Sequence, residues 1–434
     1  MQRGFDQAHV SVARTRTIAS RIGAHKREPS STIQDLTNVC TVRQRRVGHA
    51  ELEGPIGRVM KKFLRGGPPN LMEISPPDPS FVSLAKHEPP VELPIFDVHL
   101  SHTPIEELER VLSSILDAIS DCGSAEIYPY SGELLIRTSE ERIVNSEGVK
   151  SLRRGTSCIM KLGLAAMNKA KKARFLSIST YSRRTMPSPE SAREEALQKT
   201  FVFRNSKRSK SNIAASRVHN VIFSPRAFSS IVSHTLAPAL RADYVGQQKS
   251  FLRGRLGKRI GTDHINVIDN GIEPSFSKTW QADKEGVPSR TTRVIEDGIL
   301  RNFLYDVYTA NANGQESTGN AEGPAGQGIS VSNLVFEHDV KDKLDDLVNG
   351  SGTVLFVDES IAYGDDRSGD FVSYPSLCYV IRNGIPIQVD GLRIRGNFLD
   401  LLANLESAST EKTDCFGCVS PYLQVANSFK ISKT

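Results

Sequence analysis

Long apolar runs are absent from this sequence. No stretch approaches the ~18 consecutive apolar residues that a transmembrane helix requires, and residues 1–6 lack the apolar centre of a signal peptide. Cysteine is also scarce, with 6 among 434 residues, too few for the disulfide framework of a small secreted protein. We therefore expect no membrane partner and a cytoplasmic protein whose thiols are reduced.

Extremes of composition are absent as well. Hydrophobic residues make up 38% of the chain and charged residues 24%, values typical of a globular protein, so a fibre and a disordered chain are excluded. A net charge of +6 permits an anionic partner. The basic residues fall into separate patches with few aromatic side chains between them, at 43–46, 169–172, 204–210 and 249–259. This scatter favours a solvated surface, so nucleic acid is not an expected partner.

The clearest predicted helix covers residues 103–121. Thr103 can cap it, Pro104 suits its first position, and Glu106 would complete a capping box. Apolar residues recur at helical spacing along it, at Ile105, Leu108, Leu112, Ile115, Leu116 and Ile119. One apolar stripe predicts a helix that packs on a core. A further helix is predicted at 51–65.

The length predicts more than one domain, because single cores stop growing at roughly 250–300 residues. Prolines crowd residues 66–94 and predict an extended connection within the N-terminal part. Strand-like alternation fills residues 124–180, and short strands between Gly, Asn and Asp turns dominate the second half. We therefore predict an α+β protein with a mixed sheet-plus-helix domain over 1–215 and a β-rich domain over 216–434.

Residues 283–321 carry the most informative pattern in the chain. The sequence of residues 283–288, DKEGVP, predicts a turn, and Asp-Gly at 297–298 supplies the positive φ angles that tight hairpin turns require. Residues 303–310 are rich in apolar and aromatic side chains and predict the second strand of a β-hairpin. The sequence STGN at 317–320 follows as a turn.

The order and spacing of these motifs resemble the TldD/PmbA family of peptide-processing proteins. The resemblance covers about the C-terminal half of the chain and implies a TldD/PmbA-type fold for the second domain. Further motifs that carry it are VIFSP at 221–225, KSFL at 249–252, KRIG at 258–261, SNLVFE at 332–337, SGD at 368–370 and VDGLRIRGN at 389–397.

The resemblance also implies where catalysis would occur in active members. They carry His-Glu-x-x-x-His on the helix after the strand at 221–223, and the two imidazoles hold zinc together with a C-terminal thiolate. Here His234 matches the first imidazole, but Thr235 replaces the general base and Ala239 replaces the second imidazole. Pro238 also interrupts the helix, at a cost of ~3 kcal/mol, and predicts that a new helix begins there.

Because this zinc motif is missing, the chain resembles the non-catalytic TldE/PmbA branch of the family. The resemblance implies no catalytic residue and no cofactor in this chain, with zinc in a TldD-like catalytic partner. The two chains would form a heterodimer that encloses a cavity for peptide substrates and supports proteolysis or maturation of unfolded or modified peptides. Four residues of one turn are the candidate peptide contacts, although Gly319 could equally serve only to turn the chain: Ser317, Thr318, Gly319 and Asn320.

Three residues remain candidate metal ligands, namely His234, Cys415 and Cys418. The two cysteines have the C-x-x-C spacing of half a zinc site or of a redox pair. A complete zinc site needs further ligands, and no second C-x-x-C or histidine pair is visible. Packing is therefore the favoured role of all three side chains.

Two other functions compete with this interpretation. A stand-alone metallopeptidase would build a divergent metal site from His234, Cys415 and Cys418, and bound metal would reveal it. A nucleic-acid or DNA-gyrase-associated module is suggested by the family's older name, modulator of DNA gyrase, and would bind DNA with steep salt dependence. The missing zinc motif argues against the first function and the scattered basic charge argues against the second.

Overall fold

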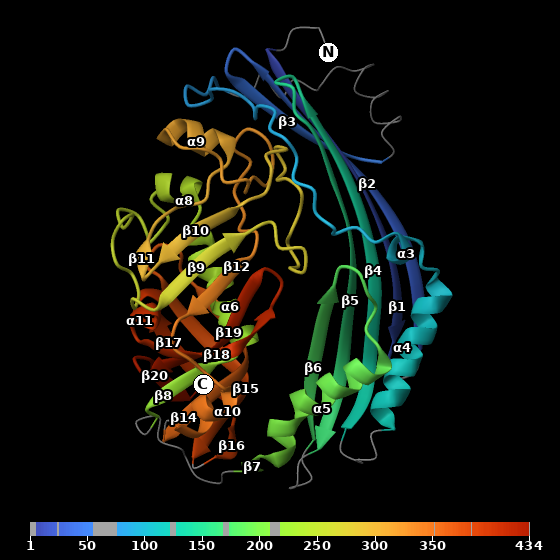
Figure 1. Ribbon diagram of the computed structural model, residues 1–434, viewed down its shortest axis with the longest axis vertical. Helices are drawn as coiled ribbons and strands as arrows, with labels where there is room; N and C mark the ends of the chain where they lie inside the picture. The colour runs from blue at the N-terminus through green and yellow to red at the C-terminus, as the bar shows by residue number, and fades with distance from the viewer. Residues whose placement is uncertain are drawn as a thin grey trace.

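Two β-sheets lie side by side in the computed structural model (Figure 1). The structure describes residues 6–23, 26–54, 76–121, 127–167, 173–208, 218–350, 352–382 and 384–433. None of the helices within these ranges is long and apolar enough to cross a membrane. The predicted α+β class is confirmed, with a mixed sheet-plus-helix region first and a β-rich region after it.

The first sheet consists of long antiparallel strands in the order β3-β2-β1-β4-β5-β6. Their bounds are β1 Gln7–Ile22, β2 Arg27–Arg43, β3 Arg46–Glu53, β4 Ile127–Asn145, β5 Lys150–Met167 and β6 Ala173–Ser182. The helix predicted at 51–65 is wrong over residues 51–53, because their hydrogen bonds with β2 make them the end of β3. From residue 55 onward that prediction lies outside the described ranges.

Helix α4, Ile105–Ser120, packs on β4 and β1 of the first sheet (Figure 1). The predicted apolar stripe is confirmed, because Leu108, Leu112, Ile115 and Ile119 are all buried. The predicted cap is wrong. A short helix α3, Val98–His102, ends at Thr103, whose hydroxyl donates to the His99 carbonyl oxygen at 3.1 Å, so Pro104 precedes α4 without a side-chain cap.

The second sheet contains the remaining strands, with a central order of β11-β10-β9-β12-β19-β8-β14-β15-β16-β7. Their bounds are β7 Lys207–Arg208, β8 Asn220–Phe223, β9 Ile265–Asn270, β10 Thr291–Glu296, β11 Ile299–Leu300, β12 Leu334–His338, β13 Lys341–Asp342, β14 Thr353–Gly364, β15 Asp370–Arg382, β16 Ile385–Val389, β17 Leu392–Asn397, β18 Leu405–Asp414, β19 Cys418–Ala426 and β20 Lys430–Lys433. Most pairs are antiparallel, but β8 and β14 run parallel, as do β12 and β19, β13 and β18, and β16 and β7.

Helix α5, Pro189–Asn205, packs mainly against α4 and the first sheet. Short helices accompany the second sheet, with bounds α6 Pro225–His234, α7 Leu236–Ala239, α8 Ala242–Gly246, α9 Val307–Asn313, α10 Leu344–Gly350 and α11 Phe398–Ala403. Helix α6 lies on the sheet, and its Phe228 ring is 4.8 Å from the Phe336 ring. The helix breaks at Thr235 (φ −126°, ψ −79°), so the predicted restart at Pro238 is misplaced. Proline is tolerated within the first turn of α7, where N–H groups have no intrahelical acceptor.

The predicted hairpin is confirmed at its turn but not beyond it. Asp297 and Gly298 have φ angles of 48° and 72°, and they join β10 to the two-residue strand β11. The strand predicted at 303–310 is wrong, because α9 begins within it. The Asp306 side chain accepts a hydrogen bond from the Thr309 N–H at 2.7 Å and so caps that helix.

An extended segment ties the two sheets together. Of the predicted connection at 66–94, residues 76–94 are described and contain neither helix nor strand. Phe81 and Leu84 are buried against the first sheet, while Asp78 accepts a hydrogen bond from the Tyr308 hydroxyl at 2.8 Å. The predicted domain boundary near residue 215 lies outside the described residues and stays a prediction.

Candidate functional site

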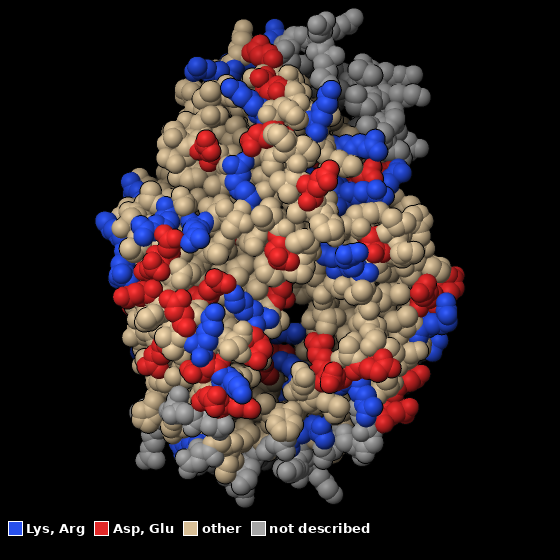
Figure 2. Space-filling model, viewed as in Figure 1, with Lys and Arg blue, Asp and Glu red and all other residues tan. Residues whose placement is uncertain are grey.

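Three cavities are each named by one lining residue. The Trp280 and Lys199 cavities have lining residues from both sheets or their flanking segments, whereas the Cys415 cavity is lined only by residues of the second half of the chain. The Trp280 cavity is about 420 Å³ and the Cys415 cavity about 450 Å³; Lys278, Glu322, Ser330 and Val331 line both, so the two are neighbours. The Lys199 cavity is about 1000 Å³ and lies between α5, β6, α10 and β14. Figure 2 shows a hollow in this face between the two halves of the molecule, with both basic and acidic side chains around it.

Buried charges at the Trp280 cavity join the first sheet to the second. Glu141 of β4 accepts hydrogen bonds from Arg153 of β5 and, at 2.7 Å, from Lys284. The guanidinium groups of Arg153 and Arg183 lie 4.8 and 5.2 Å from the Trp280 ring centroid, within cation–π distance. This arrangement fixes the position of the cavity wall formed by Trp280 and Lys284.

Buried carboxyl groups lie behind the cavity wall that Trp280 and Lys284 form. Burial raises the pKa of Asp269 and of Asp283 to about 6, although hydrogen bonds to each carboxylate oppose the shift. The pKa of Glu285 is raised well above its ordinary value by burial and then by the charges of Asp283 and Asp306. Because these folded-state pKa values lie above the unfolded ones, each group lowers stability as the pH rises through the interval between them. Backbone N–H groups solvate the carboxylates, which is a structural role.

The predicted peptide-contact residues divide into two pairs. Gly319 and Asn320 line the Trp280 cavity, and the Asn320 amide is held by Asp269 at 2.7 Å. Ser317 and Thr318 instead bond the backbone of Tyr305, which donates to the Thr318 hydroxyl at 2.8 Å. The structure therefore places only Gly319 and Asn320 at a cavity, and a role in peptide binding stays a prediction for all four residues.

The three candidate metal ligands do not converge. Cys415 and Cys418 line the Cys415 cavity. His234 lies at the end of α6 with its Nδ1 atom 2.9 Å from the Ser230 carbonyl oxygen and its ring 6.3 Å from that of Tyr363. Within the described ranges no group of three or more His, Cys, Asp or Glu side chains is placed to hold a metal ion. The structure thus gives no combined ligand set to the stand-alone metallopeptidase hypothesis.

The structure also shows the surroundings of Thr235 and Ala239, the two positions at which the zinc motif is replaced. Thr235 is fully buried, and its hydroxyl donates to the Ile231 carbonyl oxygen at 2.8 Å. Ala239 is fully buried in the core under the second sheet. A hydroxyl bound to its own helix and a methyl group in the core supply neither a general base nor a metal ligand.

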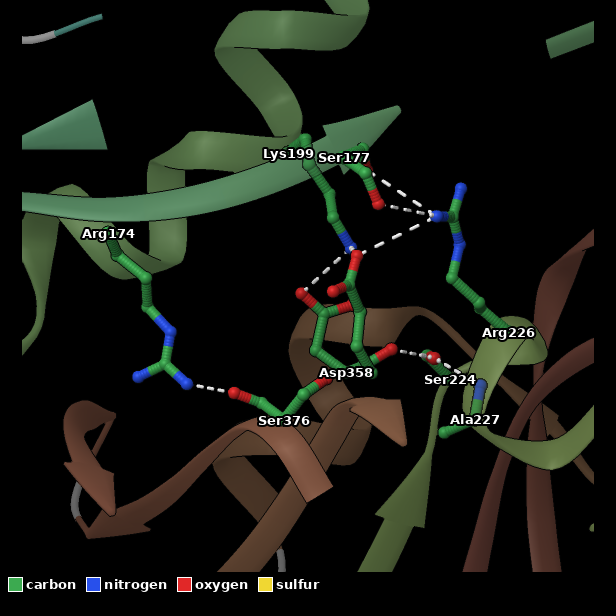
Figure 3. A network of polar contacts seen from close by, with 9 residues as sticks. Arg174, Ser177, Lys199, Ser224, Arg226, Ala227, Asp358 and Ser376 are labelled. Carbon is green, nitrogen blue, oxygen red and sulfur yellow. Dashed lines mark hydrogen bonds and ion pairs between the residues drawn. The ribbon is translucent and has the colours of Figure 1, made fainter. Parts of the chain in front are cut away.

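A charged network lines one side of the Lys199 cavity (Figure 3). The Lys199 ammonium on α5 is 3.1 Å from both carboxylate oxygens of Asp358 and 3.1 Å from Glu359 on β14. Arg226, the second residue of α6, reaches the Ser177 carbonyl oxygen of β6 at 3.4 Å. The network therefore connects α5, the edge of the first sheet and the second sheet.

Sequence reasoning missed most of these cavity residues. Trp280 is the only tryptophan of the chain, and this rarity was a usable signal. The adjacent acids Asp358 and Glu359 interrupt an apolar strand, which also indicates a buried ionic role. The partners Arg153 and Lys199 carry no comparable signal, because single basic residues are mostly exposed and nothing in the local sequence marks these two as buried.

Fold and cavities define an α+β protein with two sheets and several cavities at and beside their junction. A model of the PmbA/TldA metallopeptidase C-terminal domain matches residues 216–432, half of the chain. The chain therefore belongs to the TldD/PmbA family.

Similar proteins extend this comparison. The chain is 30% identical to an uncharacterized protein of Methanocaldococcus jannaschii over 45% of this chain and 47% of that protein. It is 26% identical to the metalloprotease PmbA homolog of Buchnera aphidicola over 63% and 62% of the two chains. These alignments span less than two thirds of either relative. The fold is similar over nearly the whole length to the crystal structure of TldE from Thermococcus kodakarensis, with a TM-score of 0.85, 23% identity, and coverage of 99% of this chain and 97% of that one.

Proposed function

We propose that this chain is a TldE/PmbA-like, non-catalytic subunit of a TldD/TldE-type metallopeptidase complex. In that complex it supports proteolysis or maturation of unfolded or modified peptides in the cytoplasm. Support comes from the family membership and from the likeness in fold to TldE. The proposed partner is a TldD-like chain that carries the zinc ion, and the two chains form a heterodimer.

The single observation that carries the proposal is the burial of Thr235 and Ala239. A water-activating carboxylate and a second imidazole must both reach a solvent-filled site. Here both positions have no exposed surface, and the Thr235 hydroxyl is already bonded within α6. Substituting a zinc ligand at position 239 would disturb the core, so this segment serves packing.

The space between the sheets supports a role in peptide binding. Strand β6 lies at the end of the first sheet, and its residues Ser177 and Ile178 line the Lys199 cavity. An exposed sheet edge can accept an extended peptide as an added strand, with main-chain hydrogen bonds that do not depend on sequence. We propose that peptides lie along this edge, with the Trp280 and Cys415 cavities holding side chains.

Assembly with the partner is the first test of this proposal. Co-expression with a TldD-type chain from the same genome is expected to give one species in size-exclusion chromatography at micromolar concentration. Obligate interfaces commonly bury ~2,000 Å² or more, so they survive such dilution. Two separate peaks that persist across a tenfold concentration range would contradict the heterodimer.

A further inference from the structure

The hairpin turn between β18 and β19 places Cys415 and Cys418 opposite each other. Its two central residues, Phe416 and Gly417, have φ angles of 54° and 97°, the positive pair found in two-residue hairpin turns. The Cys415 N–H donates to the Cys418 carbonyl oxygen at 2.9 Å, and the strands continue in register from the pair Asp414 and Val419.

This pairing suits a disulfide bond. Residues directly opposite in antiparallel strands have Cα atoms ~4.5–5.5 Å apart, and their side chains leave the sheet on the same face. Disulfides span Cα separations of ~4.4–6.8 Å, so the backbone needs little movement to allow the bond. Both cysteines are free in the structure, and both line the Cys415 cavity, where a small molecule can reach them.

The turn is held firmly and touches the first sheet. The Asp414 carboxylate accepts hydrogen bonds from the Gly417 N–H at 2.9 Å and from the Ser277 N–H at 2.7 Å. The Phe416 ring packs edge-on against Tyr181 of β6, with centroids 6.3 Å apart. Both oxygens of the Asp414 carboxylate thus accept hydrogen bonds that hold the turn in place.

We propose that Cys415 and Cys418 are a redox site that forms a reversible disulfide by exchange with a small disulfide such as oxidised glutathione. The Cys415 thiolate attacks one glutathione sulfur, forms a mixed disulfide and releases one glutathione thiolate. The Cys418 thiolate then attacks the Cys415 sulfur, forms the intrachain bond and releases the second glutathione thiolate. The two protons of the protein thiols pass to the two glutathione thiolates, so two thiols are oxidised and one disulfide is reduced.

Exposure sets the order of these steps. Cys415 is partly exposed, whereas Cys418 is only 6% exposed, so the external disulfide meets Cys415 first. Burial raises the pKa of Cys415 although the nearby Arg226 charge opposes it, and burial raises that of Cys418 well above its ordinary value. The attacking thiolate is therefore scarce at neutral pH, and the exchange rate should rise roughly tenfold for each unit of pH.

The test uses the full chain, equilibrated with mixtures of reduced and oxidised glutathione, then alkylated, digested and analysed by mass spectrometry. A cross-linked peptide that joins Cys415 to Cys418, lacks two hydrogen atoms and reverts with dithiothreitol is the expected product. The three buried thiols of Cys40, Cys158 and Cys378 serve as internal controls and should stay alkylatable only after unfolding. In Cys418→Ser the resolving thiol is missing, so glutathione should remain attached to Cys415.

Three results would overturn the proposal. The first is that wild-type Cys415 and Cys418 stay reduced at the most oxidising ratio. The second is a stable glutathione adduct on wild-type Cys415 without an intrachain bond. The third is zinc held by the two reduced thiols in the purified protein, which would make them ligands. None of these outcomes depends on the proposed role in a peptidase complex.

Discussion

The Glu141→Ala variant is expected to lose about 3–5 kcal/mol of unfolding free energy, because a buried cation is left without its partner. The Arg153 side chain is 8% exposed, and Glu141 holds it together with Lys284. Lys284 is 38% exposed, so most of the loss should come from Arg153. Chemical denaturation at pH 7 measures the difference.

The neighbouring Glu140→Ala variant is the matched control. Glu140 pairs with Arg142 at 3.0 Å on the exposed side of β4, where both side chains reach solvent. Exposed pairs contribute about 0–1 kcal/mol, so this variant should differ little from the wild type. Equal losses in the two variants would contradict the assignment of Glu141 as a buried link between the sheets.

Lowering the pH should remove the stability that Glu141 gives to the wild-type protein. Burial alone would raise the pKa of Glu141, but the charges of Arg153 and Lys284 outweigh it and hold the pKa below the ordinary value of 4.5. A lowered folded-state pKa gives stability above the unfolded value, and that stability is lost as the pH falls through the folded one. The difference in unfolding free energy between the wild type and Glu141→Ala should therefore become smaller below pH 4.5. A difference that stays constant with pH would contradict this explanation.

The Gly319→Ala variant should also be strongly destabilised, by roughly 2–5 kcal/mol. Its φ of 73° penalises any Cβ by ~1–2 kcal/mol, and that Cβ would lie 2.7 Å from the Pro288 carbonyl oxygen, a contact that adds ~1–3 kcal/mol. Gly314 has a similar φ of 62° with no atom within 4 Å, so Gly314→Ala should show the conformational part alone. If thermal unfolding shows equal losses of stability in Gly319→Ala and Gly314→Ala, the contact with Pro288 adds no steric penalty and this prediction is wrong.

This steric cost changes how the peptide-binding role of residues 317–320 must be tested. A substitution at Gly319 cannot separate a loss of peptide cleavage from a loss of stability, because the added Cβ meets the Pro288 carbonyl oxygen. Lys278→Ala is a better probe, because Lys278 is exposed and lines both the Trp280 and the Cys415 cavity. It should change stability by less than ~0.5 kcal/mol and, if these cavities hold peptide, weaken cleavage by the assembled complex.

Sequence patterns predicted those helices and turns that are determined by residues close together in the chain. The stripe from Leu108 to Ile119 fixed the buried face of α4, and Asp297-Gly298 fixed a turn, because spacing and backbone freedom act within a few residues. The α9 helix was missed for a local reason too. Its apolar and aromatic residues favour a strand, but the Asp306 cap outweighs that preference.

The cavity chemistry could not be predicted in the same way. Glu141 and Lys284 are separated by 143 positions and meet only because the two sheets lie together. The burial of Thr235 likewise depends on the packing of α6 on the second sheet. For the C-x-x-C motif the spacing left zinc and redox chemistry open, and only the turn geometry favours a disulfide.

Zinc analysis of the separated and assembled subunits tests the central claim most directly. The isolated chain is expected to hold no stoichiometric zinc and to cleave no peptide, because Thr235 and Ala239 replace the base and the second imidazole. Zinc and cleavage should appear only when the TldD-type chain is present, with the metal retained by that chain after separation. One tightly bound zinc per isolated chain, lost in His234→Ala and accompanied by peptide cleavage, would contradict the account.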